Sequence, residues 1–434
     1  MKKFLALIFA LVMALSLVAC GGNSGAQGEG DGDAATGSVY YLNFKPEAEE
    51  AWQALAKTYT EQTGVPVKVV TAASGEYETM LVSEMDKDGA PTLFQCNEGG
   101  VATWGDFCYD LSDSAVYNEL ASKDYALKNA DGEVISIAYC LETYGIIVNK
   151  ALLEQAGHSL NEITDFDSLK AVADDIHARA GELGFDAFTS AGLDGSSSWR
   201  FSGHLANMPL FYEFRDDGVS SKPATIKGTY LDNYKKVWDL YITDSATTGA
   251  ALLTATGDQA EAEFGEGKAV FYQNGTWEYS NLTEKFGMNP DDLTMIPIYC
   301  GVEGEEKAGL CTGTENYWSV NKNAKEEDIK ATLDFLYWVV TSEEGTSMMA
   351  EQFGACPFNS SKAPSNPFSA LANEYVANGC YPVTWAFNYT PAVNDWRAAV
   401  VDALSKYTAG NGSWDDVKTA FVEGWATQYA NENA

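Results

Sequence analysis

Short β-prone runs alternate with amphipathic segments along most of the chain, beginning at residue 39. Residues 39–42 are Val-Tyr-Tyr-Leu, and apolar side chains then recur at three- and four-residue spacing from Ala48 to Tyr59, which predicts a strand followed by a helix. Gly64 ends this helix, and residues 65–70 form a second β-prone run. A strand, a helix and a strand in this order predict a parallel sheet.

The same alternation continues toward the C-terminus and predicts the fold class α/β. Residues 77–85 are expected to be helical up to the break at Gly89, and residues 92–95 to form a strand. Two β-prone runs, residues 135–148 and 314–320, are expected to carry the chain between two lobes. Further helices are expected at residues 169–180, 230–241, 329–340 and 396–407.

The first twenty residues have the pattern of a secretion signal. Lys2 and Lys3 precede an apolar stretch over residues 4–18, which is shorter than the ~20 residues that a membrane-spanning helix needs. The stretch ends in Leu-Val-Ala directly before Cys20, and this arrangement resembles the bacterial lipobox, in which the cysteine is acylated and the chain is cut just before it. We therefore expect a signal peptide at residues 1–19 and a lipid on Cys20. A plain signal followed by a chance cysteine is the alternative.

Residues 20–38 are expected to link this lipid to the folded part. The stretch after the cysteine is mostly Gly, Ala, Asp, Glu and Ser and contains no large apolar side chain, so it cannot bury enough surface to order itself. A lipid at one end of such a tether would hold the folded part at the extracellular face of the cell membrane and leave it free to turn.

Acidic residues outnumber basic ones more than twofold. The chain has 27 Lys and Arg against 62 Asp and Glu, and removal of residues 1–19 takes away two lysines and no acid, which leaves a formal charge of −37. A body with this charge is repelled by nucleic acid, so we expect no nucleic-acid partner, and the charge favours a soluble monomer. The hydrophobic content of 46% is that of a globular protein.

Cysteine and histidine spacing predicts no metal site and no cofactor. His158, His177 and His204 are far apart in the sequence, and no cysteine pair has the CxxC spacing. An odd number of cysteines remains after the lipobox, so at least one thiol is free, and most are expected to be small buried hydrophobes with their pairing left open. These cysteines stand at positions 96, 108, 140, 300, 311, 356 and 380.

Several segments, in a fixed order behind the lipobox, are similar to a known family. They are residues 61–67 (Glu-Gln-Thr-Gly-Val-Pro-Val), Glu142 seven residues before Asn149-Lys150, residues 267–270 leading into 274–277 (Asn-Gly-Thr-Trp), residues 342–345 and residues 353–357. Together they resemble the extracellular solute-binding proteins of carbohydrate ABC importers, the maltodextrin-binding type, over nearly all of the mature chain. One position departs, because Val148 stands where the family has Tyr.

The resemblance implies a two-lobed, periplasmic-binding-protein-like fold with a hinge and a central cleft. Lobe one would comprise residues 39–143 plus 312–357, and lobe two residues 144–311 plus 358–434. It further implies a protein that is not an enzyme. Such a protein would bind a carbohydrate, and an oligosaccharide above all, in the cleft and deliver it to the ABC permease subunits in the membrane.

A sugar site requires flat aromatic side chains and fixed polar groups, because a sugar offers apolar ring faces and a rim of hydroxyls. By the resemblance, Trp277 and Trp396 match stacking positions, and Trp385 is the rival of Trp396. Trp199 matches an aromatic contact of the second lobe, and Glu142 a sugar-binding carboxylate. The other candidates, beside these residues and in the loops after the first strands, are Asn43, Lys45, Glu47, Asn97, Glu98, Arg200 and Glu278. Core packing, an ion pair or a solvated loop is the alternative for each.

Two other classes of function stay open. A cell-surface glycoside hydrolase needs a pair of carboxylates, and 62 acids do not exclude one, although the chain has no Gly-x-Ser-x-Gly and no His-Glu-x-x-His motif. A solute-binding protein for a polyamine, a metal or a peptide would suit the acidic charge, but the tryptophan pattern fits sugar rings better.

Overall fold

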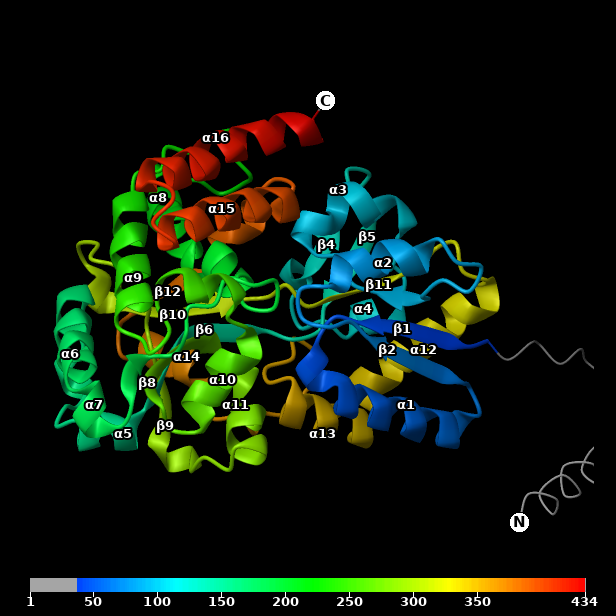
Figure 1. Ribbon diagram of the computed structural model, residues 1–434. Coiled ribbons are helices and arrows are strands. Elements are labelled where there is room, and N and C mark those ends of the chain that lie inside the picture. Colours follow the sequence, from blue (N-terminus) through cyan, green and yellow to red (C-terminus); the bar gives the residue numbers. More distant parts are fainter. Residues whose placement is uncertain (1–36, 434) are drawn as a thin grey trace, which may run out of the picture. The chain divides into compact units, whose positions relative to one another are not determined.

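The computed structural model describes residues 37–433 (Figure 1). These residues belong to one unit of the chain, Thr36–Ala434. The predicted signal peptide, Cys20 and residues 20–36 of the predicted tether lie outside the described residues. No helix between residues 37 and 433 combines the length and the apolar character that a membrane crossing requires.

Six strands form the first sheet: β1 (Val39–Asn43), β2 (Val67–Thr71), β3 (Leu93–Phe94), β4 (Ala126–Lys128), β5 (Val134–Ala138) and β11 (Tyr317–Val320). Their order across the sheet is β2-β1-β3-β11-β5-β4. Strand β1 runs parallel to β2 and β3, which confirms the predicted strand-helix-strand opening. Strand β11 is antiparallel to both β3 and β5, so the sheet is mixed rather than purely parallel.

The second sheet is built around a long central strand and contains β6 (Glu142–Asn149), β7 (Asp186–Phe188), β8 (Ala269–Gly275), β9 (Leu293–Ile296), β10 (Ala308–Gly313) and β12 (Tyr381–Thr384). The order is β12-β10-β6-β8-β7, and β9 also pairs with β6. All eight residues of β6 are buried, since β6 has strands at both edges and side chains packed on both faces.

The chain passes between the sheets at three places. These passages lie between β5 and β6, between β10 and β11, and between β11 and β12. The runs 135–148 and 314–320, expected to carry the chain between lobes, contain the first two passages, and the first run is two strands rather than one. The limits of the two lobes in sequence stay a prediction.

Helices cover both sheets (Figure 1). The helices beside the first sheet are α1 (Glu49–Thr63), α2 (Tyr77–Met85), α3 (Val101–Trp104), α4 (Ala115–Asn118), α12 (Glu326–Thr341) and α13 (Glu343–Gln352). Around the second are α5 (Lys150–Gln155), α6 (Phe166–Ala178), α7 (Ala180–Leu183), α8 (Asn207–Asp217), α9 (Leu231–Thr243), α10 (Gly257–Gly265), α11 (Glu278–Ser280), α14 (Phe368–Ala377), α15 (Val393–Thr408) and α16 (Trp414–Glu432). The predicted helix at 77–85 coincides with α2, and the other predicted helices overlap α1, α6, α9, α12 and α15.

The first strand-helix-strand unit shows why the sequence pattern succeeds there. The side chains of Trp52, Leu55, Ala56 and Tyr59 in α1 are buried in the core. Gly64 ends the helix with a φ of 77°, and its N–H donates to the carbonyl of Thr60. A side chain at this position would be strained in that left-handed conformation, so glycine suits the helix end.

An aromatic cluster forms the core beneath the first sheet. The Trp52 ring is fully buried and lies with its centroid 5.0 Å from that of Tyr41, 4.9 Å from Phe353 and 5.8 Å from Trp318. Tyr139 stacks on Trp318 at 4.7 Å. Edge-to-face and offset contacts of this kind add to the free energy of burying the rings.

We expect Trp52→Ala to lower the free energy of unfolding by about 3–5 kcal/mol, because it opens a cavity in this cluster. Urea unfolding followed by circular dichroism measures the change. Val82→Ala on α2 is the control, since Val82 is 54% exposed and its loss should change stability by less than ~0.5 kcal/mol. Equal effects of the two substitutions would contradict the assignment of Trp52 to the core.

Candidate functional site

A cavity of about 1010 Å³ is lined by residues that belong to both sheets and their helices. Its walls come from the loops after β1, β2 and β3, the first residue of β6, residues 195–204, the end of β8 and one side of α15. The volume is at the upper end of the ~300–1,000 Å³ range of sites for drug-sized ligands, so the cavity has room for a ligand of several rings.

Most of the residues predicted for the site line this cavity. They are Lys45, Glu47, Asn97, Glu142, Trp199, Arg200, Trp277, Glu278 and Trp385. Asn43, Glu98 and Trp396 do not.

Trp396 is a core residue of the helix pair α15 and α16. Its side chain is fully buried, its Nε1 donates to the carbonyl of Phe421 at 2.9 Å, and its ring packs edge-on against the Phe421 ring at 4.7 Å. This placement corrects the expectation that Trp396 contacts the ligand. Its rival Trp385 lines the cavity, whereas the neighbouring Arg397 takes the cavity-facing position on α15.

Asn43 and Glu98 lie behind the cavity wall and hold their neighbours in place. The Asn43 amide donates to the Lys45 carbonyl at 2.7 Å, and its Oδ1 accepts from the Lys45 N–H at 3.1 Å. Glu98 accepts from the Tyr317 hydroxyl at 2.7 Å, and burial raises the pKa of Glu98 to about 7. Both residues therefore support the loops that carry Lys45 and Asn97. Neither lines the cavity, and their direct contact with a ligand stays a prediction.

A buried ion pair joins the loop after β1 to the start of β6. The Lys45 ammonium contacts the carboxylate of Glu142, lies 2.7 Å from Glu47 Oε1 and is only 5% exposed. Burial alone would lower the pKa of Lys45, but the two carboxylates outweigh it and raise that pKa well above its usual value. The second oxygen of Glu142 accepts from the Asn316 amide at 2.6 Å.

Aromatic rings gather along one wall of the cavity around His204. The His204 ring stacks on Tyr144 with centroids 4.0 Å apart, and Trp199 and Trp277 lie 5.0 Å and 5.4 Å from it. Trp385 lies 5.8 Å from the same ring. Burial, aided by nearby arginines, lowers the pKa of His204 well below its usual value, so the ring is neutral and can pack beside an apolar surface.

His204 was not expected in the site from the sequence. It belongs to a π-helix, Arg200–Leu205, and such helical irregularities are frequent at functional sites. A lone histidine carries no motif, and the π-turn that places it depends on packing rather than on local spacing.

Glu278 is a buried carboxyl group directly after the aromatic Trp277. Its Oε1 accepts from the Asn274 amide at 2.7 Å, while its Oε2 has no protein partner within residues 37–433. Burial, and then the carboxylates of Glu261 and Glu47, raise the pKa of Glu278 to about 8. The group is therefore mostly protonated at neutral pH and can donate to a ligand oxygen as well as accept.

Other buried polar atoms of the cavity wall also lack a partner in the described part of the chain. The donors among them are Nε of Arg200, Nε of Arg397 and Nε1 of Trp385, and Nδ1 of His204 can donate or accept according to its tautomer. The acceptors besides Glu278 are Oδ1 of Asn316 and Oε1 of Gln95. Since buried polar groups are normally hydrogen-bonded, a ligand that both donates and accepts would complete them. Gln95, Asn316 and Arg397 belong to no motif and were missed at the sequence level.

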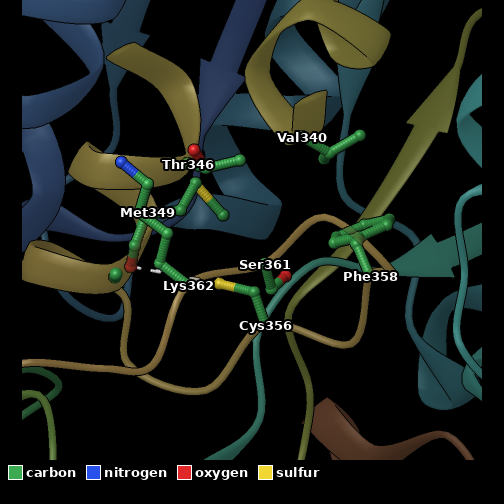
Figure 2. A pocket seen from close by; sticks show the side chains of 8 residues that line it. Val340, Thr346, Met349, Cys356, Phe358, Ser361 and Lys362 are labelled. Carbon is green, nitrogen blue, oxygen red and sulfur yellow. Dashed lines mark hydrogen bonds between the residues drawn. The ribbon is translucent and has the colours of Figure 1, made fainter. Parts of the chain in front are cut away.

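A second hollow is much smaller. This hollow of about 10 Å³ lies between α12, α13 and the segment 356–362, where the Cys356 thiol is 3.9 Å from the Met349 carbonyl (Figure 2). It holds no more than one water. Among residues 37–433, no three His, Cys, Asp or Glu side chains are grouped to hold a metal ion.

Residues 54–375 match the family of bacterial extracellular solute-binding proteins, and the chain belongs to this family. No curated protein matches it in sequence.

Solved structures share the fold, which confirms the predicted two-lobed α/β architecture. RafE in complex with raffinose has a TM-score of 0.69 at 18% identity, covering 88% of this chain and 98% of that one. The GacH receptor of Streptomyces glaucescens has a TM-score of 0.67 at 17% identity, covering 91% and 99%. A sugar transporter protein of Bacillus licheniformis in complex with stachyose has a TM-score of 0.66 at 16% identity, covering 90% and 100%.

The raised pKa of Glu278 predicts a pH-dependent effect of Glu278→Gln on stability. The carboxyl ionises near 4.5 in the unfolded chain and near 8 in the folded protein, so the folded protein binds one more proton between these values and its stability falls as pH rises. The free energy of unfolding of Glu278→Gln, relative to the unsubstituted protein, should therefore rise by up to ~1.4 kcal/mol per pH unit across this window. Urea unfolding at several pH values measures it.

Glu306→Gln is the matched control, because Glu306 is exposed. Its stability difference should not change with pH over the same window. A flat pH profile for Glu278→Gln as well would show that Glu278 is ionised in the folded protein.

Proposed function

We propose that the cavity binds a carbohydrate, with an oligosaccharide as the natural ligand, and that the protein presents it to ABC permease subunits. The observation that carries the proposal is the pairing of an aromatic wall with unpartnered donors and acceptors. A sugar hydroxyl both donates and accepts, and a sugar ring presents an apolar face to Trp199 or Trp277. The volume of the cavity supports the same class, as do the sugars in complex with similar proteins, raffinose and stachyose.

The proposed contacts divide into platforms and hydrogen-bonding groups. Trp199, Trp277 and Trp385 would stack on or pack against the rings. The polar groups that would bind hydroxyls are Lys45, Glu47, Gln95, Asn97, Glu142, Arg200, Glu278, Asn316 and Arg397.

We propose binding without chemistry. The family consists of solute-binding proteins, and Glu142, the carboxylate at the crossing, is tied by Lys45 and Asn316. Incubation of the purified protein with oligosaccharides should release no reducing ends. Release of reducing ends would favour the glycoside hydrolase.

The binding prediction concerns Trp277. Calorimetry with raffinose, stachyose and chitooligosaccharides, beside polyamines and divalent metals, should detect heat with a saccharide. Trp277→Ala should then weaken binding by at least ~1 kcal/mol, because a stacked aromatic face is lost. Trp338→Ala on α12 is the control of the same residue type away from the cavity, and its affinity should be unchanged.

Two results would count against this proposal. Binding heat with a polyamine or a metal, but with no saccharide, would indicate that the ligand is a cation. Unchanged saccharide affinity in a folded Trp277→Ala protein would remove Trp277 from the site.

We further propose that the protein works as a monomer held to the membrane by lipid on Cys20, with residues 20–38 as the tether. The lobes would comprise residues 39–143 plus 312–357 and residues 144–311 plus 358–434. The family is extracellular, and the lipobox pattern supports the anchor.

The proposed lipid anchor predicts that the protein partitions into detergent rather than water. In Triton X-114 partition of cells expressing the full chain, the protein should enter the detergent phase, and Cys20→Ser should move it to the aqueous phase, since the acyl chains supply the membrane affinity. Recovery of both forms from the aqueous phase would show that residues 1–19 are an ordinary signal peptide and that Cys20 carries no lipid.

A further inference from the structure

Two loops that are about 120 residues apart in the sequence touch at the edge of the cavity. Ser74 and Gly75 stand between β2 and α2, and Gly195 and Ser196 stand just before the π-helix. All four residues line the cavity. The Ser74 hydroxyl donates to the Ser196 carbonyl at 3.4 Å, so the first-sheet side and the second-sheet side meet here. We call these four residues the latch.

The latch is a contact between backbones, which requires glycine at position 75. A Cβ on Gly75 would lie 2.4 Å from the carbonyl oxygen of Gly195, far inside van der Waals contact. The φ of Gly75 is +81°, which also disfavours a side chain. An alanine at position 75 would therefore force the two loops apart.

The second-sheet half of the latch is held in place by its own hydrogen bonds. The Asp194 carboxylate accepts from the Ser196 N–H at 3.0 Å and from the Ser196 hydroxyl at 2.8 Å. The Gly257 N–H donates to the same hydroxyl at 3.0 Å. The Gly195 carbonyl belongs to the same peptide unit as the Ser196 N–H, which Asp194 holds, so a small shift of this carbonyl does not relieve a clash with a side chain at position 75.

The latch is joined directly to the aromatic wall. The carbonyl of Ser196 accepts from Trp199 Nε1 at 2.9 Å as well as from the Ser74 hydroxyl. The Trp199 ring in turn lies 6.0 Å from that of Trp277. A single carbonyl thus contacts both the loop across the cavity and a proposed sugar platform.

A second contact across the cavity edge joins Gly99 and Val393, but it involves a side chain that can move. A Cβ on Gly99 would lie 2.7 Å from Cγ1 of Val393, which is a side-chain atom at the start of α15. A side chain can turn aside where a backbone carbonyl cannot. The latch is therefore the better place to test how the cavity closes.

We propose that the latch closes the cavity over the ligand and fixes Trp199 for stacking, so that Gly75 is a positioning residue for binding. The proposal rests on the proposed function. A ligand that is enclosed by both sides binds tightly only to the closed arrangement, and its apparent affinity scales with the population of that arrangement. Loss of the latch lowers this population.

The first experiment compares two glycine substitutions with the sugar that binds the unsubstituted protein. Gly75→Ala should weaken binding at least roughly fivefold, as overpacking of a tight contact does. Gly132→Ala is the matched control, because Gly132 has a φ of +86° and a Cβ there meets nothing within 4 Å. Its affinity should be unchanged. Equal losses in the two variants would assign the effect to backbone strain and overturn the latch.

The second experiment needs no ligand. A protein with Ser74→Cys and Ser196→Cys is treated with a short bis-maleimide, and peptide mapping follows the link between the two positions over time. The link should form, and it should form several-fold more slowly when Gly75→Ala is added than when Gly132→Ala is added. No link, or equal rates, would overturn the latch.

The two experiments separate the proposals. If the unsubstituted protein binds no saccharide, the proposed function fails, and the rate of linking still decides whether the loops close on one another. If a saccharide binds and neither readout distinguishes Gly75→Ala from Gly132→Ala, the latch alone fails.

Discussion

The desolvated ion pair of Lys45 and Glu142 is the interaction on which the arrangement of the site depends. A charge taken out of water must be compensated by charges and hydrogen bonds nearby, and loss of one partner leaves the other uncompensated. Lys45 comes from the loop after β1, Glu142 opens β6, and Asn316, which completes Glu142, lies between β10 and β11. One polar cluster therefore ties together two of the three places where the chain passes between the sheets. Lys45, Glu142 and Asn316 also line the cavity, and we call this part of its surface the floor.

Above this floor the cavity combines two environments that are costly to keep in a folded protein. Trp199, Trp277 and Trp385 present apolar surface, while Glu278 and Arg200 carry buried polar atoms without partners in the described residues. Such atoms reduce stability, and proteins retain them where a ligand supplies the missing partner. The raised pKa of Glu278 reflects this cost, because burial disfavours the ionised form of its carboxyl group.

The proposed closure of the cavity depends on a residue that also contacts the aromatic wall. The Ser196 carbonyl accepts from Trp199 and from Ser74, so the position of a proposed sugar platform and the contact between the two loops depend on the same atom. A ligand held between the two sides would gain from a platform already in place, because less side-chain freedom is lost on binding. The family's extracellular role suits a protein that encloses its solute and then releases it elsewhere.

The sequence alone determined the α/β class, the opening strand-helix-strand unit and the family. The class and the opening unit depend on local spacing, since the apolar positions of α1 recur once per turn and Gly64 ends the helix. The family came from the resemblance of several segments in a fixed order. Trp277 and Glu142 also came from local motifs. Trp396 shows the limit: the spacing of Trp396, Val400 and Leu404 places all three on the buried side of α15, whereas the resemblance favoured a ligand contact.

Only the tertiary structure decided which polar atoms face the cavity and which loops meet across it. Gln95, Asn316 and Arg397 look like ordinary polar residues in the sequence, and Gly75 and Gly195 are far apart in it. Their roles arise when two sheets pack around one cavity, and no local spacing encodes a contact between segments separated by long stretches of chain.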